Sequence, residues 1–322
     1  MTLEWKQALI GLGFFAGEIK LFEKRYIGQV CTQHFTRLKN EDLDLRNDSF
    51  GRNVNVLLLP VAPLPEKPPA IRFINKWLVY TPHTFKNFYV DLSGNFDSYL
   101  KHFSSKSRSL LKRKIRKLSE AVGGTISWAE YRTSSEIRKF YELARQVSIL
   151  TYQENLLGAG LPKNEQFQQE MIEAADRNEA RGFLLFMDKK PIAFLYNSAK
   201  DGILFYDHVG YDPDYKMLSP GTVLLYLALK SLFDQKQFRI FDFTEGEGQH
   251  KELFATHFKE CGKVYFFRKT LSNILLIILH LGTDRFMSTV GRILNGIGIK
   301  RALKMSIRKI SNLKHKIRTY NE

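Results

Sequence analysis

The chain has few of the residues that mark secreted or metal-binding proteins. It contains two cysteines, Cys31 and Cys261, which are far apart and form no C-x-x-C pattern. Disulfide frameworks and structural zinc sites need several cysteines at short spacing, so we expect neither, and no bound metal. A reducing cytoplasm is the expected location for such a chain.

Long hydrophobic runs are also missing. The two best candidates, Ala8–Gly17 and Ile274–Leu281, fall far short of the roughly 20 apolar residues that a transmembrane helix needs. Ala8–Gly17 could imitate the core of a signal peptide, but Glu4 and Lys6 precede it and no small-residue cleavage site follows. We therefore expect neither a membrane span nor a signal peptide. The sequence also shows no repeat of fixed period.

Acidic residues are too few to balance the basic ones. The chain has 49 Lys and Arg against 33 Asp and Glu, which gives a net charge of +16 at pH 7. This surplus predicts attraction to nucleotide phosphates, nucleic acid or an anionic membrane, and does not choose among them. A hydrophobic content of 44% permits a sizeable core, and 322 residues suggest two domains or one domain with additions.

The N-terminal region gives weak signals. Phe22–Phe35 and Val54–Val61 could each form a strand, and Ile71–Tyr80 and Asn87–Asp91 have the composition of strands. The run Pro60–Pro69 predicts a linker or loop, because proline fixes φ and lacks an N–H donor.

A basic helix is predicted at Ser104–Leu118. It carries seven Lys and Arg and no acid, while Leu111, Ile115 and Leu118 form an apolar stripe. Gly123-Gly124 predicts the C-terminal end of this helix. Arg108 and Arg113 could contact phosphates, although such a run is more often a solvated face.

The periodicity is clear from residue 125 onward. It predicts, in order, the strand Thr125–Tyr131, helices Ser135–Ile149 and Asn164–Arg177, strands Phe183–Met187, Ile192–Ala199 and Ile203–Val209, helix Thr222–Phe233, strand Phe238–Thr244, helix His250–Phe258 and strand Lys263–Arg268. Helices and strands in mixed order, with hairpins between the strands, indicate a fold of the α/β (α+β) class.

The start of the helix at Thr222–Phe233 has the features of an anion site. Ser219 is a suitable N-cap, Pro220 suits the first helical position, and Gly221 lets a ligand approach the backbone. The first amides of a helix have no partner inside it and bind phosphate well. Lys216 and Thr222 are further candidates for phosphate binding. A capped helix without a ligand is the alternative.

The order of elements resembles that of the GNAT acyltransferase fold, a mixed, mainly antiparallel sheet flanked by helices. Lys216-x-x-Ser219-x-Gly221 is similar to its pyrophosphate loop, Gln/Arg-x-x-Gly-x-Gly/Ala, with Lys and Ser at the first two key positions. Four segments resemble more closely the BioF2-like (CelD-like) acetyltransferase family, which is related to the FemAB transferases. They are Thr151-Tyr152-Gln153, Leu218–Gly221, Asp242–Gly246 and His250-Lys251.

The resemblance covers about residues 93–270 and implies three regions. Residues 1–92 stand where the family has a degenerate GNAT-like half, and form an incomplete version of it. Residues 93–270 are the acyltransferase domain, and 271–322 a basic amphipathic helical tail. In that tail Lys and Arg surround an apolar stripe of Leu303, Ile307, Ile310, Leu313 and Ile317. It could lie on an anionic membrane face or pack on its own domain.

The activity that the resemblance implies is transfer of an acyl group, with acetyl expected, from acyl-CoA to an amine or hydroxyl. Members of the family are bacterial and often linked to polysaccharide or cell-envelope biosynthesis, so a sugar or envelope precursor is the expected acceptor. In this fold the strands before and after the pyrophosphate helix splay apart, and the pantetheine arm enters the gap.

Acyl transfer needs a base that takes a proton from the acceptor. Asp242, Glu245 and His208 are the candidates. Alternation along a strand predicts that Leu204, Tyr206, His208 and Gly210 share one face. His208 could instead be a hydrogen-bonded histidine of the core, and Glu245 could be a solvated acid without a catalytic role. Asp242 between two phenylalanines is costly to bury unless it is paired or functional.

Acceptor binding is predicted for four residues: Tyr152, Gln153, Tyr206 and Lys251. Lys251 could instead pair with Glu245 or Glu247. Two other functions remain open: a transferase that uses aminoacyl-tRNA as donor, and a catalytically degenerate, membrane-associated assembly protein. A DNA-binding role is not expected, because no recognition motif accompanies the basic segments.

Overall fold

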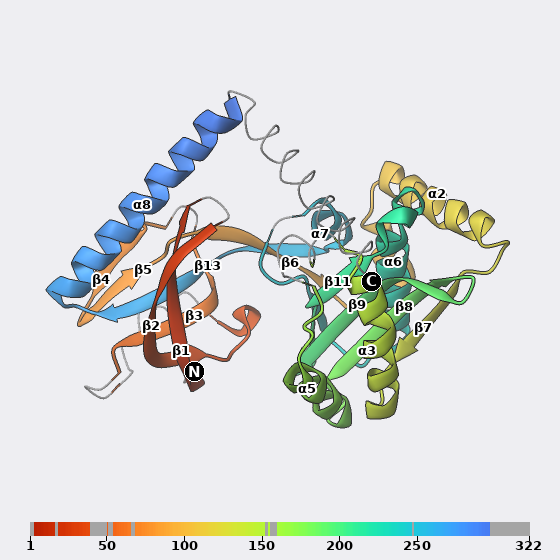
Figure 1. The fold of residues 1–322 in the computed structure, drawn as a ribbon, viewed down its shortest axis with the longest axis horizontal. Coiled ribbons are helices and arrows are strands. Elements are labelled where there is room, and N and C mark those ends of the chain that lie inside the picture. The colour runs from red at the N-terminus through yellow and green to blue at the C-terminus, as the bar shows by residue number, and fades with distance from the viewer. Residues whose placement is uncertain are drawn as a thin grey trace, which may run out of the picture. The chain divides into compact units, whose positions relative to one another are not determined.

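The computed structural model describes residues 3–16, 19–38, 50, 54–65, 68–151, 154, 160–246 and 248–296 (Figure 1). The chain divides into two compact units, one of residues 1–86 and 259–322 and one of residues 87–258. Tyr152, Gln153, Glu247 and the apolar stripe expected at 303–317 lie outside the described residues. None of the helices in the described part has the length and apolarity to cross a bilayer.

The first unit is a twisted sheet with one long helix. Its elements are β1 (Trp5–Ala16), β2 (Ile19–Cys31), the 3₁₀ turn η1 (Phe35–Arg37), β3 (Val56–Pro63), β4 (Ile71–Ile74), β5 (Trp77–Tyr80), most of β13 (His257–Arg268) and α8 (Leu271–Gly296). The strand order is β1-β2-β3-β13-β5-β4, and only β2 and β3 run parallel. The β1–β2 hairpin is the longest ladder, and sequence reasoning did not identify β1.

Helix α8 covers this sheet through one of its sides. Ile10, Leu12 and Phe14 alternate along β1, so their side chains share a face and are buried. Ile277 of α8 belongs to the same apolar cluster and has no exposed surface. The opposite side of α8 does not take part in this core.

Two prolines lie inside strand β3, where a loop or linker was expected. Pro63 pairs with Cys261, and Pro60 lies at a shift in register between β3 and β13. The described pairs between β2 and β3 end at Leu58. Beyond that point β3 is an edge on one side, so a missing N–H interrupts no ladder there.

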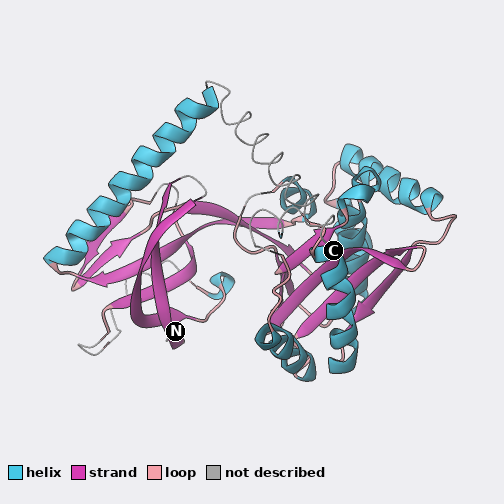
Figure 2. Ribbon diagram, in the orientation of Figure 1, coloured by secondary structure: helices cyan, strands magenta, loops and turns pink. Residues whose placement is uncertain are grey.

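The second unit contains the remaining strands and most of the described helices (Figure 2). Its elements are β6 (Thr84–Asp91), α1 (Phe96–Lys101), α2 (Ser105–Ala121), β7 (Ser127–Tyr131), α3 (Ser134–Ser148), α5 (Glu165–Asp176), β8 (Ala180–Met187), β9 (Lys190–Lys200), β10 (Ile203–Phe205), β11 (His208–Tyr211), the 3₁₀ segment η3 (Pro213–Leu218), α6 (Pro220–Gln235), β12 (Ile240–Asp242) and α7 (Gln249–Phe254). The strand order is β6-β12-β10-β9-β8-β7, with β11 on β9. Of the strand pairs described in this unit, only β10 and β12 run parallel.

Helices cover both faces of this sheet. Alternation along β8 places Phe183 and Leu185 in one core with α1, α2, α6 and α7, and Leu184 in the other core with α3 and α5. This mixed, mainly antiparallel sheet flanked by helices confirms the predicted fold class.

The helix boundaries follow their capping signals. Ser104 caps α2 by accepting a hydrogen bond from the Ser107 amide (3.1 Å), and α2 ends before Gly123, whose φ is +73°. Thr133 and Glu136 form a reciprocal capping box at the start of α3. Both helices were predicted within three residues of their observed ends.

Candidate active site

The sheet of the second unit opens between β11 and β12. β10 pairs with β12 as far as Phe205 and Asp242, and the Tyr206 amide then donates to the Asp242 carbonyl (2.9 Å). Beyond this point β11 pairs with β9, and none of the described pairs joins it to β12. The expected strand Ile203–Val209 is therefore two strands, and their break produces a divergence of the kind predicted on either side of α6.

The break changes which side chains share a face. Tyr206 packs in the core that contains α6, whereas the ring of His208 lies 5.2 Å from Phe167 and 6.3 Å from Tyr196 in the α3–α5 layer. The expectation that Tyr206 and His208 share a face was wrong, because the irregular backbone at Asp207 shifts the alternation by one residue. Burial lowers the pKa of His208.

Asp242 ends strand β12 and has clear structural partners. Its side chain is 3% exposed. One carboxylate oxygen, Oδ1, accepts hydrogen bonds from Asn87 Nδ2 (2.6 Å) and from the Thr244 amide (2.9 Å). The second bond forms an Asx turn, which supports the positive φ of Thr244 (+58°). Asp242 therefore shapes the loop that follows it.

Lys251 of α7 binds the same loop, the one that follows β12. Its Nζ donates to the carbonyls of Glu245 (3.0 Å) and Thr244 (3.4 Å), and the side chain is buried. Burial lowers the pKa of Lys251, and the charges of Asp242 and Glu245 oppose this shift. The predicted residues Asp242, Glu245 and Lys251 therefore form one cluster, in which the Glu245 side chain is exposed.

Tyr206 borders this cluster from the core side. Its ring is buried against Phe241 and Phe243 and lies 5.8 Å from the ring of His250. Burial raises the pKa of the Tyr206 phenol, and it lowers that of His250 together with the positive charge of Lys251.

Asp207 is the residue that sequence reasoning missed. Its side chain has an exposed surface at the strand break, and Oδ2 accepts a hydrogen bond from the Ser198 amide (2.7 Å). Protein atoms crowd its other sides, and this desolvation raises the pKa of Asp207 to about 6, with a smaller contribution from the negative charge of Asp242. The signal in the sequence that could have identified Asp207 is its position as a carboxylate within a mostly apolar strand.

The start of α6 differs from a simple capped helix. Ser219 has a left-handed φ of +54° and its side chain makes no capping hydrogen bond, so the expectation of a Ser219 cap was wrong. Its carbonyl accepts from the amides of Thr222 (3.0 Å) and Val223 (3.2 Å). Pro220 has no N–H. Among the described residues this leaves only the Gly221 amide without a partner in the first turn.

Space and positive charge are available beside that amide. A Cβ placed on Gly221 would meet only the ring of Tyr211, at 3.5 Å. Lys114 of α2 reaches the same turn, where its Nζ donates to Thr222 Oγ1 (3.3 Å). Burial lowers the pKa of Lys114, as does the neighbouring Arg113. Lys216 is exposed in η3. The predicted phosphate-binding loop at 216–222 is therefore joined by a cation from another helix, Lys114 of α2.

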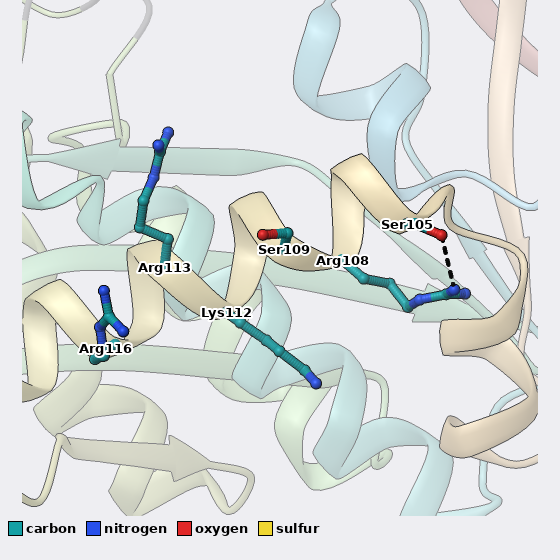
Figure 3. A pocket seen from close by; sticks show the side chains of 6 residues that line it. All are labelled: Ser105, Arg108, Ser109, Lys112, Arg113 and Arg116. Atoms are coloured by element: carbon teal, nitrogen blue, oxygen red, sulfur yellow. Dashed lines mark hydrogen bonds between the residues drawn. The ribbon is translucent and has the colours of Figure 1, made fainter.

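A second set of cations lies on the outer side of α2. A recess of about 650 Å³ is lined by Ser105, Arg108, Ser109, Lys112, Arg113 and Arg116 (Figure 3). Arg108 donates to the Phe103 carbonyl (2.9 Å) and to Ser105 Oγ (3.4 Å), and Arg116 lies 3.6 Å from Glu120. With about 3.6 residues per turn, most of these side chains point away from the side that carries Lys114.

No cluster of three or more His, Cys, Asp or Glu suited to a metal ion occurs in the described part of the chain. The groups described above that could take part in chemistry are the carboxylates at the strand divergence and the amide and cations at the start of α6.

Comparison with known protein families gives a match to part of the chain. Residues 105–252 match the family model of the acetyltransferase (GNAT) domain. A comparison with curated protein sequences gives no match.

The solved structures that the chain matches share little sequence with it. The C-terminal domain of a putative lysylphosphatidylglycerol synthetase from Agrobacterium fabrum is 11% identical, with 66% of each chain covered and a TM-score of 0.43. FemX is 10% identical, with 86% of this chain and 90% of that chain covered and a TM-score of 0.47. The PaiA N-acetyltransferase from Thermoplasma acidophilum, in complex with coenzyme A, is 15% identical, with 34% and 75% covered and a TM-score of 0.24.

The chain spans just under two thirds of the Agrobacterium domain. Residues 105–252 are thus similar to the GNAT domain, and the order of elements around them gives this part of the chain a GNAT-like fold.

Proposed function

We propose that the protein transfers an acyl group, with acetyl expected, from acyl-CoA to an amine or hydroxyl of a sugar or cell-envelope precursor. The observation that carries this proposal is the divergence of β11 and β12, the strands before and after α6, together with the Gly221 amide of α6, which has no partner among the described residues. A thioester needs a slot for its pantetheine arm and a positive site for its diphosphate, and we propose that the parted strands and the first turn of α6 supply them.

The diphosphate is proposed to bind at the first turn of α6. The Gly221 amide, the positive end of the helix dipole and Lys114 all act on this turn. Lys216, Ser219 and Thr222 remain the proposed additional contacts from η3 and the turn itself. Each of these groups favours a negatively charged ligand over a neutral one.

The pantetheine arm is proposed to run along β11. The Asp212 amide donates to the Ile192 carbonyl in the register of the β9–β11 pair (2.8 Å). Antiparallel alternation then directs the amides of His208 and Gly210 toward β9, and those of Val209 and Tyr211 toward the gap. Two amides on the open side of a strand can hold an amide-containing chain and stabilise a developing oxyanion.

Asp207 is the proposed general base. The acceptor nitrogen or oxygen attacks the thioester carbonyl carbon while the Asp207 carboxylate takes the acceptor proton. The C–S bond then breaks, and the CoA thiolate leaves and takes up a proton. A pKa of about 6 leaves Asp207 mostly ionised at neutral pH yet closer to its operating pH than an ordinary aspartate, which favours proton transfer.

The other predicted site residues take different proposed roles. Asp242 holds the loop after β12, and Lys251 fixes the same loop, so both position the acceptor side of the site. Glu245 is exposed at this loop and remains a proposed acceptor contact. Tyr152 and Gln153 also remain predictions for acceptor binding. A cytoplasmic location follows from the use of acyl-CoA.

Calorimetric titration of the full chain with acetyl-CoA tests the donor. We expect micromolar binding that Gly221→Trp abolishes, because the indole would fill the space beside the free amide. Gly94→Trp is the matched control, since a Cβ on Gly94 has no atom within 4 Å. Absent binding at high micromolar donor, or equal binding by Gly221→Trp and the wild type, would contradict the proposal.

The recess on α2 favours a second candidate, a transferase that takes aminoacyl-tRNA as donor. Lys112 and Arg113 line it with no hydrogen-bond or ion-pair partner among the described residues. This candidate predicts that tRNA binds tightly at 50 mM salt, that binding weakens steeply at 200 mM, and that Lys112→Ala with Arg113→Ala reduces the salt dependence. If the protein binds neither tRNA nor acyl-CoA, the degenerate assembly role is favoured instead.

A further inference from the structure

Helix α8 exposes an apolar side to solvent. Five of its large side chains are each more than half exposed: Leu271, Leu275, Ile278, Leu279 and Phe286. No charged residue occurs from Leu271 to Thr283. The other side of the helix is already buried against the first unit through Ile277 and His280. A helix on a protein surface normally turns polar residues outward, so this exposed side indicates a binding surface.

The end of the β1–β2 hairpin extends this surface. Phe15, Leu21 and Phe22 are each about half exposed. The Phe22 ring stacks on Phe14 at 4.2 Å, and the Phe14 ring lies 4.7 Å from that of His280 on α8. The hairpin end therefore lies beside the middle of α8. We call these eight exposed side chains, five on α8 and three on the hairpin, the α8–hairpin surface.

The positive charge of the protein is concentrated on the unit that carries this surface. Residues 87–258 contain 23 Lys and Arg against 22 Asp and Glu, so the second unit is nearly neutral. Residues 259–322 contain 14 Lys and Arg against 3 Asp and Glu. Eight of these cations follow α8 directly in the sequence, between positions 300 and 318.

We propose that the α8–hairpin surface docks on an anionic lipid surface, with α8 lying in the plane of the interface. The apolar side chains would enter the boundary between headgroups and acyl chains, and the excess of Lys and Arg in the sequence of residues 259–322 would attract this unit to anionic headgroups. Stable membrane attachment takes two such signals, an apolar one and a polybasic one. A second copy of the chain would bring the same positive charge to the contact and is disfavoured. The inference is independent of the transferase proposal.

Vesicle flotation of the full chain provides the test. The vesicles are pure phosphatidylcholine or phosphatidylcholine with 30 mol% phosphatidylglycerol. We expect the wild type to bind the anionic vesicles at least tenfold more tightly than the neutral ones. Leu275→Ser with Leu279→Ser should lose at least tenfold in affinity for the anionic vesicles. Ile149→Ser, which changes an exposed apolar residue of the second unit, should bind as the wild type does.

Three outcomes would overturn the proposal. One is absence of binding to anionic vesicles. Another is unchanged binding by the double variant while deletion of residues 297–322 abolishes it, because the basic segment would then act alone. The third is a wild-type dimer in light scattering that the double variant dissociates, without vesicle binding by either, because the surface would then join two copies.

A fluorescent label gives a readout that does not depend on a destabilising variant. Both native cysteines are buried, so a cysteine introduced by Leu279→Cys can be labelled selectively with nitrobenzoxadiazole. We expect its emission to shift to the blue with anionic vesicles, whereas a label at Ile149→Cys should not respond. A label at position 279 that does not respond while the protein floats with the vesicles would contradict insertion of α8.

Discussion

The amide of Tyr206 donates to the carbonyl of Asp242 at 2.9 Å, and it is the last described backbone hydrogen bond between β10 and β12. The next residue along the chain is Asp207. Two carboxylates therefore flank the point where the strands part, in different surroundings. Asp242 is buried and accepts two hydrogen bonds, whereas Asp207 keeps an exposed surface. Two acids in such different environments are suited to different tasks.

The activity should rise with pH as Asp207 ionises. Because its pKa is about 6, kcat/KM should increase about tenfold per pH unit below pH 6 and level off above it. Asp207→Asn should lower kcat/KM by about 10²- to 10⁴-fold and remove this acidic limb. The measurement is the pH profile of CoA release. Asp176→Asn, at an exposed position on α5, is the control. An unchanged limb in Asp207→Asn would assign the base elsewhere.

Lys114 should contribute to donor affinity through the first turn of α6. Its Nζ lies 3.3 Å from Thr222 Oγ1, and a ligand diphosphate at this turn would come within reach of the same ammonium group. We expect Lys114→Met to raise the Kd for acetyl-CoA about tenfold, which corresponds to about 1.4 kcal/mol. The loss should be smaller at high salt, because salt screens charges. Lys117→Met, an exposed change on the same helix, should leave the Kd unchanged. Equal values for both variants would contradict a role for Lys114.

Local signals in the sequence were sufficient for the helices and the fold class. The caps Ser104 and Thr133 and the glycines after α2 fixed helix ends, and the nearly uniform apolar composition of α6 predicted its burial. The order of elements after residue 125 then indicated a mixed sheet. These features depend on neighbours within a few residues, which the sequence displays directly.

The site itself depends on contacts between distant residues. Nothing near Lys114 in the sequence indicates that it reaches Thr222, 108 residues later. The break at Tyr206 and Asp207 was missed because the segment 203–209, which is apolar apart from Asp207 and His208, satisfies the pattern of one strand equally well. The prolines of β3 were wrongly predicted to lie in a loop. A strand tolerates proline where it is an edge, and whether it is an edge at a given residue depends on partners distant in the sequence.

Arg181 should be a major contributor to the stability of the second unit. Its side chain is completely buried, lies 3.6 Å from Glu130, and stacks on the Phe238 ring at 4.9 Å. It also donates to Asn178 Oδ1 (2.7 Å). Removing the guanidinium leaves the largely buried Glu130 carboxylate without this nearby positive charge and the Ala180 carbonyl without its side-chain donor, so Arg181→Met should lower the free energy of unfolding by about 3 kcal/mol.

Urea unfolding followed by circular dichroism measures this loss. The matched control is Arg177→Met, which removes an exposed ion pair with Glu179 (2.8 Å) and should cost less than about 1 kcal/mol. A loss below about 1 kcal/mol for Arg181→Met would show that the buried ion pair is replaceable by apolar packing.

The packing of α8 against the sheet of the first unit should weaken as the pH falls below about 6.5. His280 Nδ1 lies 2.7 Å from the Tyr80 hydroxyl and Nε2 lies 3.0 Å from the Gly13 carbonyl. The carbonyl can only accept, so Nε2 carries the proton and Nδ1 accepts from Tyr80 in a neutral ring. Burial lowers the pKa of His280 below 6.5, and the positive charge of a protonated His83 adds to this. The Gly13 carbonyl and Asp284 act in the opposite direction.

The sign of the effect follows from proton binding. Below about pH 6.5 the unfolded chain binds a proton at position 280 that the folded chain does not, so acid favours detachment by up to about 1.4 kcal/mol per pH unit. Hydrogen exchange of α8 amides, corrected for intrinsic rates, should therefore accelerate between pH 7.5 and 5.5. His280→Gln keeps a donor and an acceptor but cannot titrate, and should reduce this dependence. His102→Gln, an exposed change in the second unit, should not. Equal acceleration in wild type and His280→Gln would place the responsible group elsewhere, because the remaining titrating side chains would then account for all of it.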